Sequence, residues 1–487
     1  MDTKSNSDKD FFVKELVSLF TDSNIANTAA GGIFTFKYGK YIVDKYTPTE
    51  LIEAAHNLDN SVKERYAAEL NAAFLMYRYF KKHPNELELG KQKMDSRKEK
   101  KINTLSLSTL FYLSALRTKP FMLLAGVSGT GKSRIVRKLA QASITKDLQK
   151  EYDPKSVEKG FNRWELHKPA NFELVQVKPN WHNSLEVVGY RSNIGSPHYE
   201  FTPFVEFVAR AWKHQNIPFF LCLDEMNLAP VEQYFAEFLS AIESRSIENG
   251  EYETDPIIKP FVEFGEVVCT QMIDHLVGKV DASKVVPGSI EAKLVERFKT
   301  KGLTLPPNLL VLGTVNMDET TFSFSRKVLD RAMSIVMNDV EYDKFFTGET
   351  ENDMAEFDDA TKKLLIDRPI RGLEAEDNGA EQVEQYLTAI NEVLHDTPFK
   401  LGYRAANEAL LYVSAAHQFD SSIDVNTALD EFTLMKILSR IEGDKRSIGN
   451  LLDDLQRVIN DSYPASNKKL VQMAKTLQSK QFVSYWT

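Results

Sequence analysis

The 487-residue chain is poor in cysteine and has neither an apolar run long enough to span a membrane nor an excess of positive charge. Its only cysteines, Cys222 and Cys269, are too few for a disulfide framework or a zinc cluster, so we expect both to be reduced and structural. Residues 1–8 are polar, which argues against a signal peptide and leads us to expect a cytoplasmic protein. The net charge of −9 disfavours indiscriminate binding to nucleic acid, although a local basic channel is compatible with it.

The length and the 43% hydrophobic content suggest about three packed domains. We place a small, mainly helical domain at 1–100, an α/β core at 101–339 and a helical lid at 340–487. In the first domain, apolar residues at helical spacing predict helices near 11–20 and 62–77. The strand formers of residues 33–46, interrupted at Gly39, predict a short hairpin, and the charged residues 91–101 predict a solvated linker.

From about residue 105, apolar strands alternate with helices, a pattern typical of a parallel sheet covered on both faces. The strands are predicted at 120–125, 172–177, 218–223 and 308–313. Two insertions interrupt the series: residues 144–170, which we expect to be loop-like, and residues 246–307, of mixed pattern. The fold class expected is therefore α/β, with a C-terminal helical lid.

A glycine-rich segment, Gly126-Val-Ser-Gly-Thr-Gly-Lys-Ser133, follows the first predicted strand and precedes the amphipathic stretch 134–140. In such a loop the backbone N–H groups surround phosphate, the lysine reaches the β- and γ-oxygens, and the serine hydroxyl can hold Mg2+. The positive end of the following helix lies under the same phosphates. The motif predicts a nucleoside triphosphate site made by Gly126, Val127, Ser128, Gly129, Thr130, Gly131, Lys132 and Ser133.

Polar residues also follow the third and fourth predicted strands. Asp224 would lie beside the metal held by Ser133, and Glu225 would polarise the water that attacks the γ-phosphorus. Asn316 could hydrogen-bond both the γ-phosphate and that water. The structural alternatives are a pair of solvated acids that cap a strand and an asparagine in a turn.

Two arginines follow in residues 324–335, which we predict to form a short helix. In a ring, Arg331 would face the nucleotide of the neighbouring subunit, where an arginine supplied in trans contributes roughly 10³ to 10⁵ in rate. A salt bridge to Asp330 or a solvent-facing position is the alternative. Arg326, near the start of the helix, is a second candidate for the same role.

These motifs run in order through most of residues 105–487, and several short segments accompany them. With them, the chain resembles the AAA+ nucleoside triphosphatases of the McrB family, the motor components of modification-dependent restriction systems. The segments that carry the resemblance are Leu124–Ser133, Pro179-Asn-Trp-His-Asn183, Gly189-Tyr190, Leu221–Ala229, Gly313-Thr-Val-Asn-Met317, Leu401-Gly-Tyr-Arg404, Lys436–Gly443 and Val483-Ser-Tyr-Trp486.

The resemblance implies a P-loop AAA+ core in which Lys132 and Ser133 bind phosphate and metal. It also implies that Asp224 and Glu225 form the Walker B pair and that Asn316 is the sensor 1 residue. Family members hydrolyse a nucleoside triphosphate with Mg2+, and their McrB namesake prefers GTP. Because the phosphate-site residues do not contact the base, ATP and GTP both stay open, and we favour ATP as the commoner substrate of the wider class.

The resemblance further implies a homo-oligomeric ring, a hexamer in this family, with Arg331 as the trans finger and Arg404 as the sensor 2 arginine of the lid. Where the family has a run of arginines near the finger, this chain has Leu329-Asp-Arg-Ala332, with a single arginine. The role of Arg326 as a second finger therefore stays open.

No nuclease motif is evident. The nearest spacing is Asp281 with Glu291 and Lys293, but residues 289–298 have helical apolar spacing, whereas that chemistry places its last acid and its lysine on a strand. The resemblance instead implies a separate McrC-like nuclease partner. In the first domain, aromatic and basic residues alternate in a pattern that suits either DNA bases and phosphates or, as we favour, a half-buried hairpin: Phe34, Phe36, Lys37, Tyr38, Lys40, Tyr41, Lys45 and Tyr46.

The sequence thus predicts a Mg2+-dependent, ring-forming motor that hydrolyses ATP or GTP to drive DNA translocation in an anti-phage restriction system. Two alternatives stay open. One is a chaperone of the same class that remodels proteins, and the other is a nucleotide-gated scaffold that senses phage components.

Overall fold

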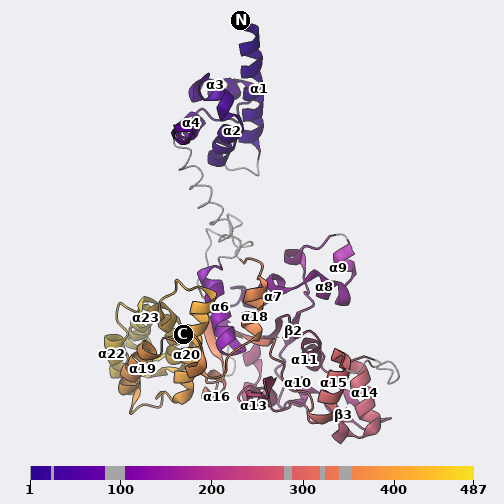
Figure 1. The fold of residues 1–487 in the computed structure, drawn as a ribbon. Helices are drawn as coiled ribbons and strands as arrows, with labels where there is room; N and C mark the ends of the chain where they lie inside the picture. The colour runs from indigo at the N-terminus through magenta and orange to yellow at the C-terminus, as the bar shows by residue number, and fades with distance from the viewer. Residues whose placement is uncertain are drawn as a thin grey trace. The chain divides into compact units, whose positions relative to one another are not determined.

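The computed structural model describes residues 2–22, 27–82, 105–158, 160–278, 288–317, 324–338 and 354–486. The chain divides into two compact units, Met1–Ile102 and Asn103–Thr487 (Figure 1). The predicted linker at 91–101 and the predicted domain boundaries after residues 100 and 339 lie outside the described residues, so the boundaries stay predictions. Among the described residues, no helix combines the length and the apolar character that crossing a membrane requires.

The first unit is helical, as predicted, with α1 (Asp2–Thr21), α2 (Asn27–Ile42), α3 (Pro48–Leu58) and α4 (Tyr66–Lys82). Helix α3 begins efficiently because Pro48 occupies its first turn and the Thr47 side chain accepts the Glu50 N–H. Side chains from all four helices form one core, which includes Leu16, Phe34, Leu51, Leu70 and Phe74.

The predicted hairpin at 33–46 is wrong, because most of this segment belongs to α2. Phe34, Tyr38 and Ile42 recur every four residues and are buried, so the helical spacing of the core positions outweighs the strand propensity of the individual residues. Gly39 lets α4 approach closely, since a Cβ atom there would lie 2.7 Å from the Tyr77 ring. Of the aromatic residues in this segment, Phe36 and Tyr41 remain exposed, as do Lys37, Lys40 and Lys45.

The second unit is built on a five-stranded sheet in the order β2-β5-β8-β1-β9, and every neighbouring pair is parallel. The four predicted strands are confirmed as β1 (Phe121–Gly126), β2 (Phe172–Gln176), β5 (Phe219–Asp224) and β8 (Leu309–Asn316). The α/β fold class is therefore confirmed.

The prediction of one helix over 324–335 is wrong. Helix α16 spans only Arg326–Leu329, and Met333–Val336 form β9, the edge strand next to β1. Met333 is fully buried and lies beside Met122 in the sheet. Four residues are too few to show a recognisable alternation of apolar and polar positions, so pairing with β1 decides the conformation of Met333–Val336.

Alternate residues of the central strands face two separate cores, as a sheet covered on both faces requires. Phe121, Leu123 and Ala125 of β1 pack in the core that contains α11 (Pro203–Lys213). Met122 and Leu124 pack in a second core with α6 (Leu107–Thr118), α7 (Lys132–Ser143) and the lid helices. Both cysteines are buried and free.

The insertion at 144–170 is not loop-like, because it folds into α8 (Lys146–Tyr152), α9 (Lys155–Glu158) and the short 3-10 helix Arg163–Glu165. Polar side chains of this insertion make hydrogen bonds that stabilise its structure. The Thr145 side chain accepts the Leu148 N–H at the start of α8, and the buried Gln149 side chain accepts the Ala170 N–H at 2.8 Å. The polar composition had suggested exposure, whereas these side chains hold the insertion together.

The insertion at 246–307 begins with a hairpin and continues with two helices, namely β6 (Ser246–Glu248), β7 (Glu251–Glu253), α14 (Glu266–Leu276) and α15 (Ile290–Thr300). Helix α15 confirms the helical interpretation of 289–298, and Asp281 lies outside the described residues. The shorter elements of this unit are α10 (Leu185–Val188), β3 (Tyr190–Ser192), β4 (His198–Glu200), the 3-10 helices Met226–Leu228 and Phe261–Phe264, α12 (Val231–Tyr234) and α13 (Ala236–Ala241).

Residues 354–486 are mainly helical, in agreement with the predicted lid. The lid helices are α18 (Asp359–Ile366), α19 (Ala380–Leu394), α20 (Tyr403–Phe419), α21 (Val425–Phe432), α22 (Lys445–Val458) and α23 (Pro464–Lys480). Shorter elements are the 3-10 helices Gly372–Glu374 and Leu438–Arg440, a π-helix at Thr433–Ile437 and the antiparallel strands β10 (Glu442–Asp444) and β11 (Phe482–Ser484). In Figure 1, α19, α20, α22 and α23 gather at one end of this unit, and α14 and α15 lie at the other.

Candidate functional site

The glycine-rich segment forms a loop between the carboxyl end of β1 and the first turn of α7. Gly129 and Gly131 have φ of 86° and 83°, a left-handed conformation that glycine adopts without strain. The ammonium group of Lys132 lies within the loop and donates to the carbonyl oxygens of Gly126 at 2.9 Å and Val127 at 2.8 Å. The loop thus places a lysine and a helix N-terminus together, as phosphate binding requires.

Three side chains from three elements meet beside this loop. The Ser133 hydroxyl, in the first turn of α7, donates to Oδ1 of Asp224 at 3.0 Å. The Thr314 hydroxyl, on β8, donates to the same oxygen at 2.8 Å. Because β1, β5 and β8 are parallel and adjacent, their carboxyl ends lie at one edge of the sheet, where open α/β sheets bind ligands.

Glu225 follows directly at the end of β5 in the left-handed region, with φ of 54° and ψ of 49°. For a residue other than glycine this conformation costs on the order of 1 kcal/mol, and such strain concentrates at functional sites. Two hydrogen bonds hold it there: the Glu225 N–H donates to Thr314 Oγ1 at 2.9 Å, and Asn316 Nδ2 donates to Glu225 Oε1 at 3.2 Å. The Asn227 side chain in turn donates to the Asn316 carbonyl oxygen.

The structure therefore brings together Lys132, Ser133, Asp224, Glu225 and Asn316, which the sequence predicted as one site. It adds two residues that sequence reasoning missed. Thr314 contacts both acids, and its position two residues before Asn316 on the same strand could have suggested it. Asn338, whose Oδ1 accepts the Val127 N–H at 3.2 Å, follows β9 and gave no sequence signal.

Oxygen ligands at this edge suit Mg2+. That ion keeps several waters and is usually bound by one or two carboxylates together with substrate phosphates. The Ser133 hydroxyl and the Asp224 carboxylate are close enough to share one ion, so the residues present fit. In the part of the chain that the structure describes, no cluster of three or more His, Cys, Asp or Glu side chains could hold a metal by itself.

Arg331 lies at the opposite end of the sheet, in the turn between α16 and β9. The expected alternative, a salt bridge from Arg331 to Asp330, is not seen among the described residues. The Asp330 carboxylate pairs instead with Arg440 of the lid at 3.2 Å. Since β1 and β9 run parallel and side by side, roughly 20 Å of strand separates this turn from the glycine-rich loop.

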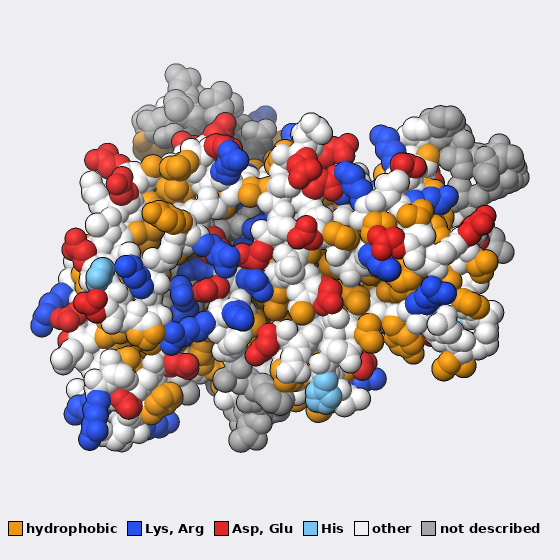
Figure 2. All heavy atoms as spheres, turned by 90° about the horizontal axis from the view of Figure 1, so that it is seen from below, with side chains coloured by type: hydrophobic (Ala, Val, Ile, Leu, Met, Phe, Trp, Pro, Cys, Tyr) orange, Lys and Arg blue, Asp and Glu red, His pale blue; other side chains and the backbone are white. Residues whose placement is uncertain are grey.

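Arg404 and Arg326 also lie at the amino-terminal end of the strands. Arg404, in the first turn of α20, pairs with Glu243, whose carboxylate is also 3.2 Å from the ammonium of Lys119, two residues before β1. Arg326 donates to the Pro398 carbonyl oxygen at 3.1 Å and lies over the Phe399 ring. Figure 2 shows lysine and arginine side chains gathered around a hollow in the half of the molecule that carries the lid.

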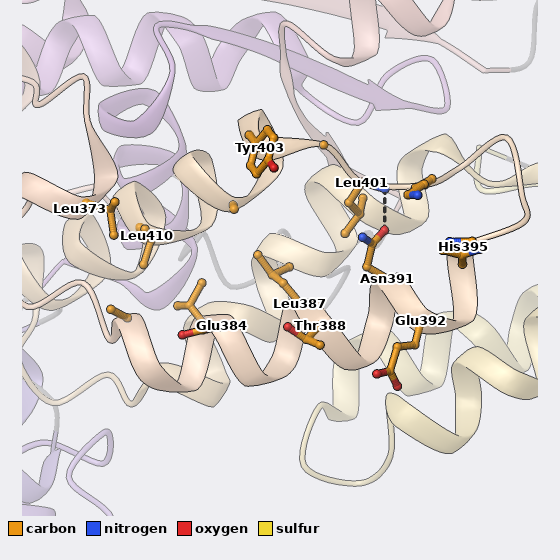
Figure 3. Close-up of a pocket in the computed structure, with 15 residues that line it drawn as sticks. Leu373, Glu384, Leu387, Thr388, Asn391, Glu392, His395, Leu401, Tyr403 and Leu410 are labelled. Carbon is orange, nitrogen blue, oxygen red and sulfur yellow. Dashed lines mark hydrogen bonds between the residues drawn. The ribbon is translucent and has the colours of Figure 1, made fainter.

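The segment that leads to Arg404 borders a groove of about 690 Å³ between α19 and α20. Figure 3 shows Leu387 and Leu410 along this groove and the hydrogen bond from the Leu401 N–H to the Asn391 side chain, 2.9 Å long. Tyr403 stands at the rim and is 97% exposed. The hydrogen bond to Asn391 fixes the chain just before Arg404, so the position of that arginine follows the lid.

The similarity of this chain to known proteins is low or covers only part of the chain. A family model described as a domain of unknown function, DUF8727, matches residues 353–482, less than half of the chain. No curated protein matches. Among solved structures, one similar chain is a candidate ATPase from Cytophaga hutchinsonii ATCC 33406, with 13% identity, a TM-score of 0.41, and coverage of 77% of this chain and 98% of that one.

Proposed function

We propose that this chain is a Mg2+-dependent nucleoside triphosphatase. The observation that carries the proposal is the meeting of Lys132, Ser133, Asp224, Glu225 and Asn316 at one edge of the sheet, from segments up to 184 positions apart in the printed sequence. A solvated strand cap would leave the two acids without ordered neighbours. Here each acid is held by a hydroxyl or amide from another strand.

Each residue has a separate task in this proposal. The loop N–H groups, the α7 N-terminus and Lys132 bind and orient the triphosphate. Ser133 and Asp224 would hold Mg2+, which offsets the charge of the phosphate oxygens. Asn316 orients the Glu225 carboxylate, which can then accept a hydrogen bond from the attacking water and draw its proton away from the γ-phosphorus.

The active form in this proposal is a homo-oligomeric ring, with six copies as in the family that the motifs resemble. Arg331 and Arg404 lie about the length of β1 away from Lys132, which is too far for them to reach a triphosphate in the same copy. In a ring, the face that carries these arginines meets the glycine-rich loop of the next copy. Arg331 then acts in trans as the finger, and Arg404 contacts the nucleotide from the lid.

The biological role proposed is that of a motor. The order of the motifs resembles the McrB family, so we propose that ATP or GTP hydrolysis, with ATP favoured, drives DNA translocation in a cytoplasmic anti-phage restriction system. Cleavage then belongs to a McrC-like nuclease on another chain. A remodelling chaperone would share the same hydrolytic site but would act on protein.

The test combines one variant with two stimulants. Glu225→Gln should bind nucleotide with unchanged affinity, form rings and hydrolyse at least roughly 10²-fold more slowly. The matched control is Glu232→Gln, at an exposed acid of α12, which should retain the wild-type rate. Hydrolysis by the wild type should rise with double-stranded DNA and not with an unfolded protein.

Three outcomes would contradict parts of this proposal. A Glu225→Gln variant with the wild-type rate would remove the assigned catalytic role. Stimulation by unfolded protein alone would favour the chaperone. Immunity that survives Glu225→Gln in cells would favour a nucleotide-gated sensor over a motor.

A further inference from the structure

Three charged side chains are buried together where the lid meets the core. Lys119, Glu408 and Lys436 each expose 4% or less of their side chains. The Glu408 carboxylate lies between the two ammonium groups, at 2.5 Å from Lys119 and 2.9 Å from Lys436. Charges buried in this way lose their hydration and rarely add stability compared with apolar residues. Their arrangement therefore calls for a reason other than packing.

The two lysines share a target, the turn that carries Arg331. Lys436 Nζ donates to the carbonyl oxygens of Leu329 at 3.3 Å, Asp330 at 2.9 Å and Ala332 at 3.0 Å. Lys119 Nζ donates to the Asp330 carbonyl at 3.2 Å. Leu329 is the last residue of α16, and Asp330 and Ala332 belong to the turn that follows it, so Lys436 binds carbonyls at and beyond a helix C-terminus, where unpaired acceptors attract cations.

Arg331 is thus the one residue in 329–332 whose carbonyl receives no hydrogen bond from Lys436 within the described residues. The neighbouring Asp330 side chain is held on the lid side by Arg440. Lys436 itself lies in the π-helical turn Thr433–Ile437, and such turns are rare and often occur at functional sites. The carbonyl contacts of Lys436 thus fix the turn before β9 on both sides of Arg331, whose own side chain is half-buried.

We propose that Lys436, held in place by Glu408 and Lys119, is a positioning residue for Arg331. It joins the lid to the turn, so that the arginine is presented to the neighbouring copy in one orientation. This inference rests on the proposed function, in which Arg331 acts on the nucleotide of the next copy. It adds the requirement that the hydrogen bonds between Lys436 of the lid and the turn around Arg331 stay intact for hydrolysis.

Lys436→Met is a clean variant for the test. It removes all three carbonyl contacts, yet Glu408 keeps Lys119 as an ion-pair partner, so no buried carboxylate is left alone. Lys119 also keeps Glu243 at 3.2 Å. The matched control is Lys445→Met, at an exposed lysine in the first turn of α22.

The experiment measures steady-state hydrolysis for Lys436→Met, Arg331→Ala and Lys445→Met, each alone and mixed with a Lys132→Ala copy. We expect Lys436→Met to keep its KM within about twofold and to lose roughly 10- to 100-fold in kcat, the usual effect of a residue that orients a functional group. We expect Lys445→Met to retain the wild-type rate. Mixing with Lys132→Ala should restore turnover to Lys436→Met, because the partner copy supplies a well-placed Arg331 to an intact loop.

The outcomes separate this inference from the proposed function. If Arg331→Ala is inactive but Lys436→Met retains its kcat, the positioning role is wrong and the shared site stands. The same conclusion follows if mixing with Lys132→Ala restores Arg331→Ala but not Lys436→Met. If mixing restores neither variant, the shared site is wrong. If Arg331→Ala retains its kcat, the shared site itself is wrong. If Lys436→Met does not fold, Glu408→Gln, which keeps the shape of the side chain, takes its place in the same mixtures with the same expectations.

Discussion

The two ends of strand β1 differ in the means by which they hold their functional groups. At the carboxyl end, Asp224 and Glu225 are held by neutral hydroxyl and amide donors and remain partly exposed. At the amino end, Lys119 and Lys436 are buried and are held by Glu408. The first arrangement can exchange its partners for a ligand at little cost, whereas the second fixes a loop permanently.

At the amino end of β1, the buried charge of Glu408 is stabilised by its two lysine neighbours. Burial by itself would raise the pKa of the Glu408 carboxyl, but the neighbouring charges of Lys436 and Lys119 outweigh burial and lower that pKa to about 2. Glu408 is therefore ionised throughout the physiological range. The amino end of the sheet behaves as a closed charge network, in which any one member depends on the others.

The largest expected effect comes from breaking that network. Glu408→Leu leaves two buried lysines without their common carboxylate, and we expect the free energy of unfolding to fall by about 3 to 5 kcal/mol. Denaturant unfolding followed by circular dichroism measures this. Glu384→Leu, at an exposed acid of α19, should change stability by no more than about 0.5 kcal/mol. Equal losses of unfolding free energy for the two variants would mean that the buried network contributes no more to stability than an exposed acid.

The same carboxylate predicts a dependence of stability on pH. Because the pKa of Glu408 falls from 4.5 to about 2 on folding, its contribution of about 3 kcal/mol is fully present above about pH 4.5 and is lost as the pH falls toward 2. The difference in unfolding free energy between the wild type and Glu408→Gln should therefore fall by more than half between pH 6 and pH 3. A difference that is constant over this range would contradict the network.

A smaller effect is expected at the carboxyl end, where Thr314 contacts both acids. Thr314→Val keeps the shape but removes the hydroxyl that donates to Asp224 and accepts the Glu225 N–H. We expect kcat to fall roughly 10- to 100-fold, as for other residues that orient a ligand group, with rings still forming. Thr314→Ser retains the hydroxyl and should keep most of the activity. Equal impairment of the two variants would mean that the hydrogen bonds of the hydroxyl are not the cause of the loss, because Thr314→Ser retains the hydroxyl.

The smallest effect is expected for Arg326. Its guanidinium group is already engaged by the Pro398 carbonyl and the Phe399 ring of the same copy. Arg326→Ala should therefore cost about 0.5 to 1 kcal/mol of stability, the usual contribution of an exposed cation–π contact, and leave kcat nearly unchanged. Hydrolysis assays beside Arg331→Ala provide the measurement. A loss as large as that of Arg331→Ala would make Arg326 a second finger after all.

The sequence was most informative where one local pattern decided the structure. Four of the five strands of the parallel sheet are apolar runs that could be recognised directly, and the glycine-rich loop lies between the strand and the helix that flank it in the sequence. The site at the carboxyl end was predictable for the same reason, because its residues directly follow those strands. The roles assigned to them stay predictions that the variants above can test.

The amino end could not be predicted because its partners are distant in sequence. Lys119 and Glu408 are 289 residues apart, and a buried lysine looks like a surface lysine in a sequence. Strand β9 was missed for a similar reason, since its four residues become a strand only beside β1. The helix α2 shows the reverse case, in which strand-forming residues were given too much weight against a clear four-residue repeat of buried positions.

Strand β9 touches both regions. Asn338, just beyond the carboxyl end of β9, accepts a hydrogen bond from the Val127 N–H in the glycine-rich loop. Asp330 lies three residues before the start of β9, and its carbonyl oxygen accepts hydrogen bonds from Lys119 and Lys436. Each residue of β9 pairs with a residue of β1, so this strand is held along its whole length. Strand β9 therefore links the glycine-rich loop at one end of the sheet to the Arg331 turn at the other through a single extended segment.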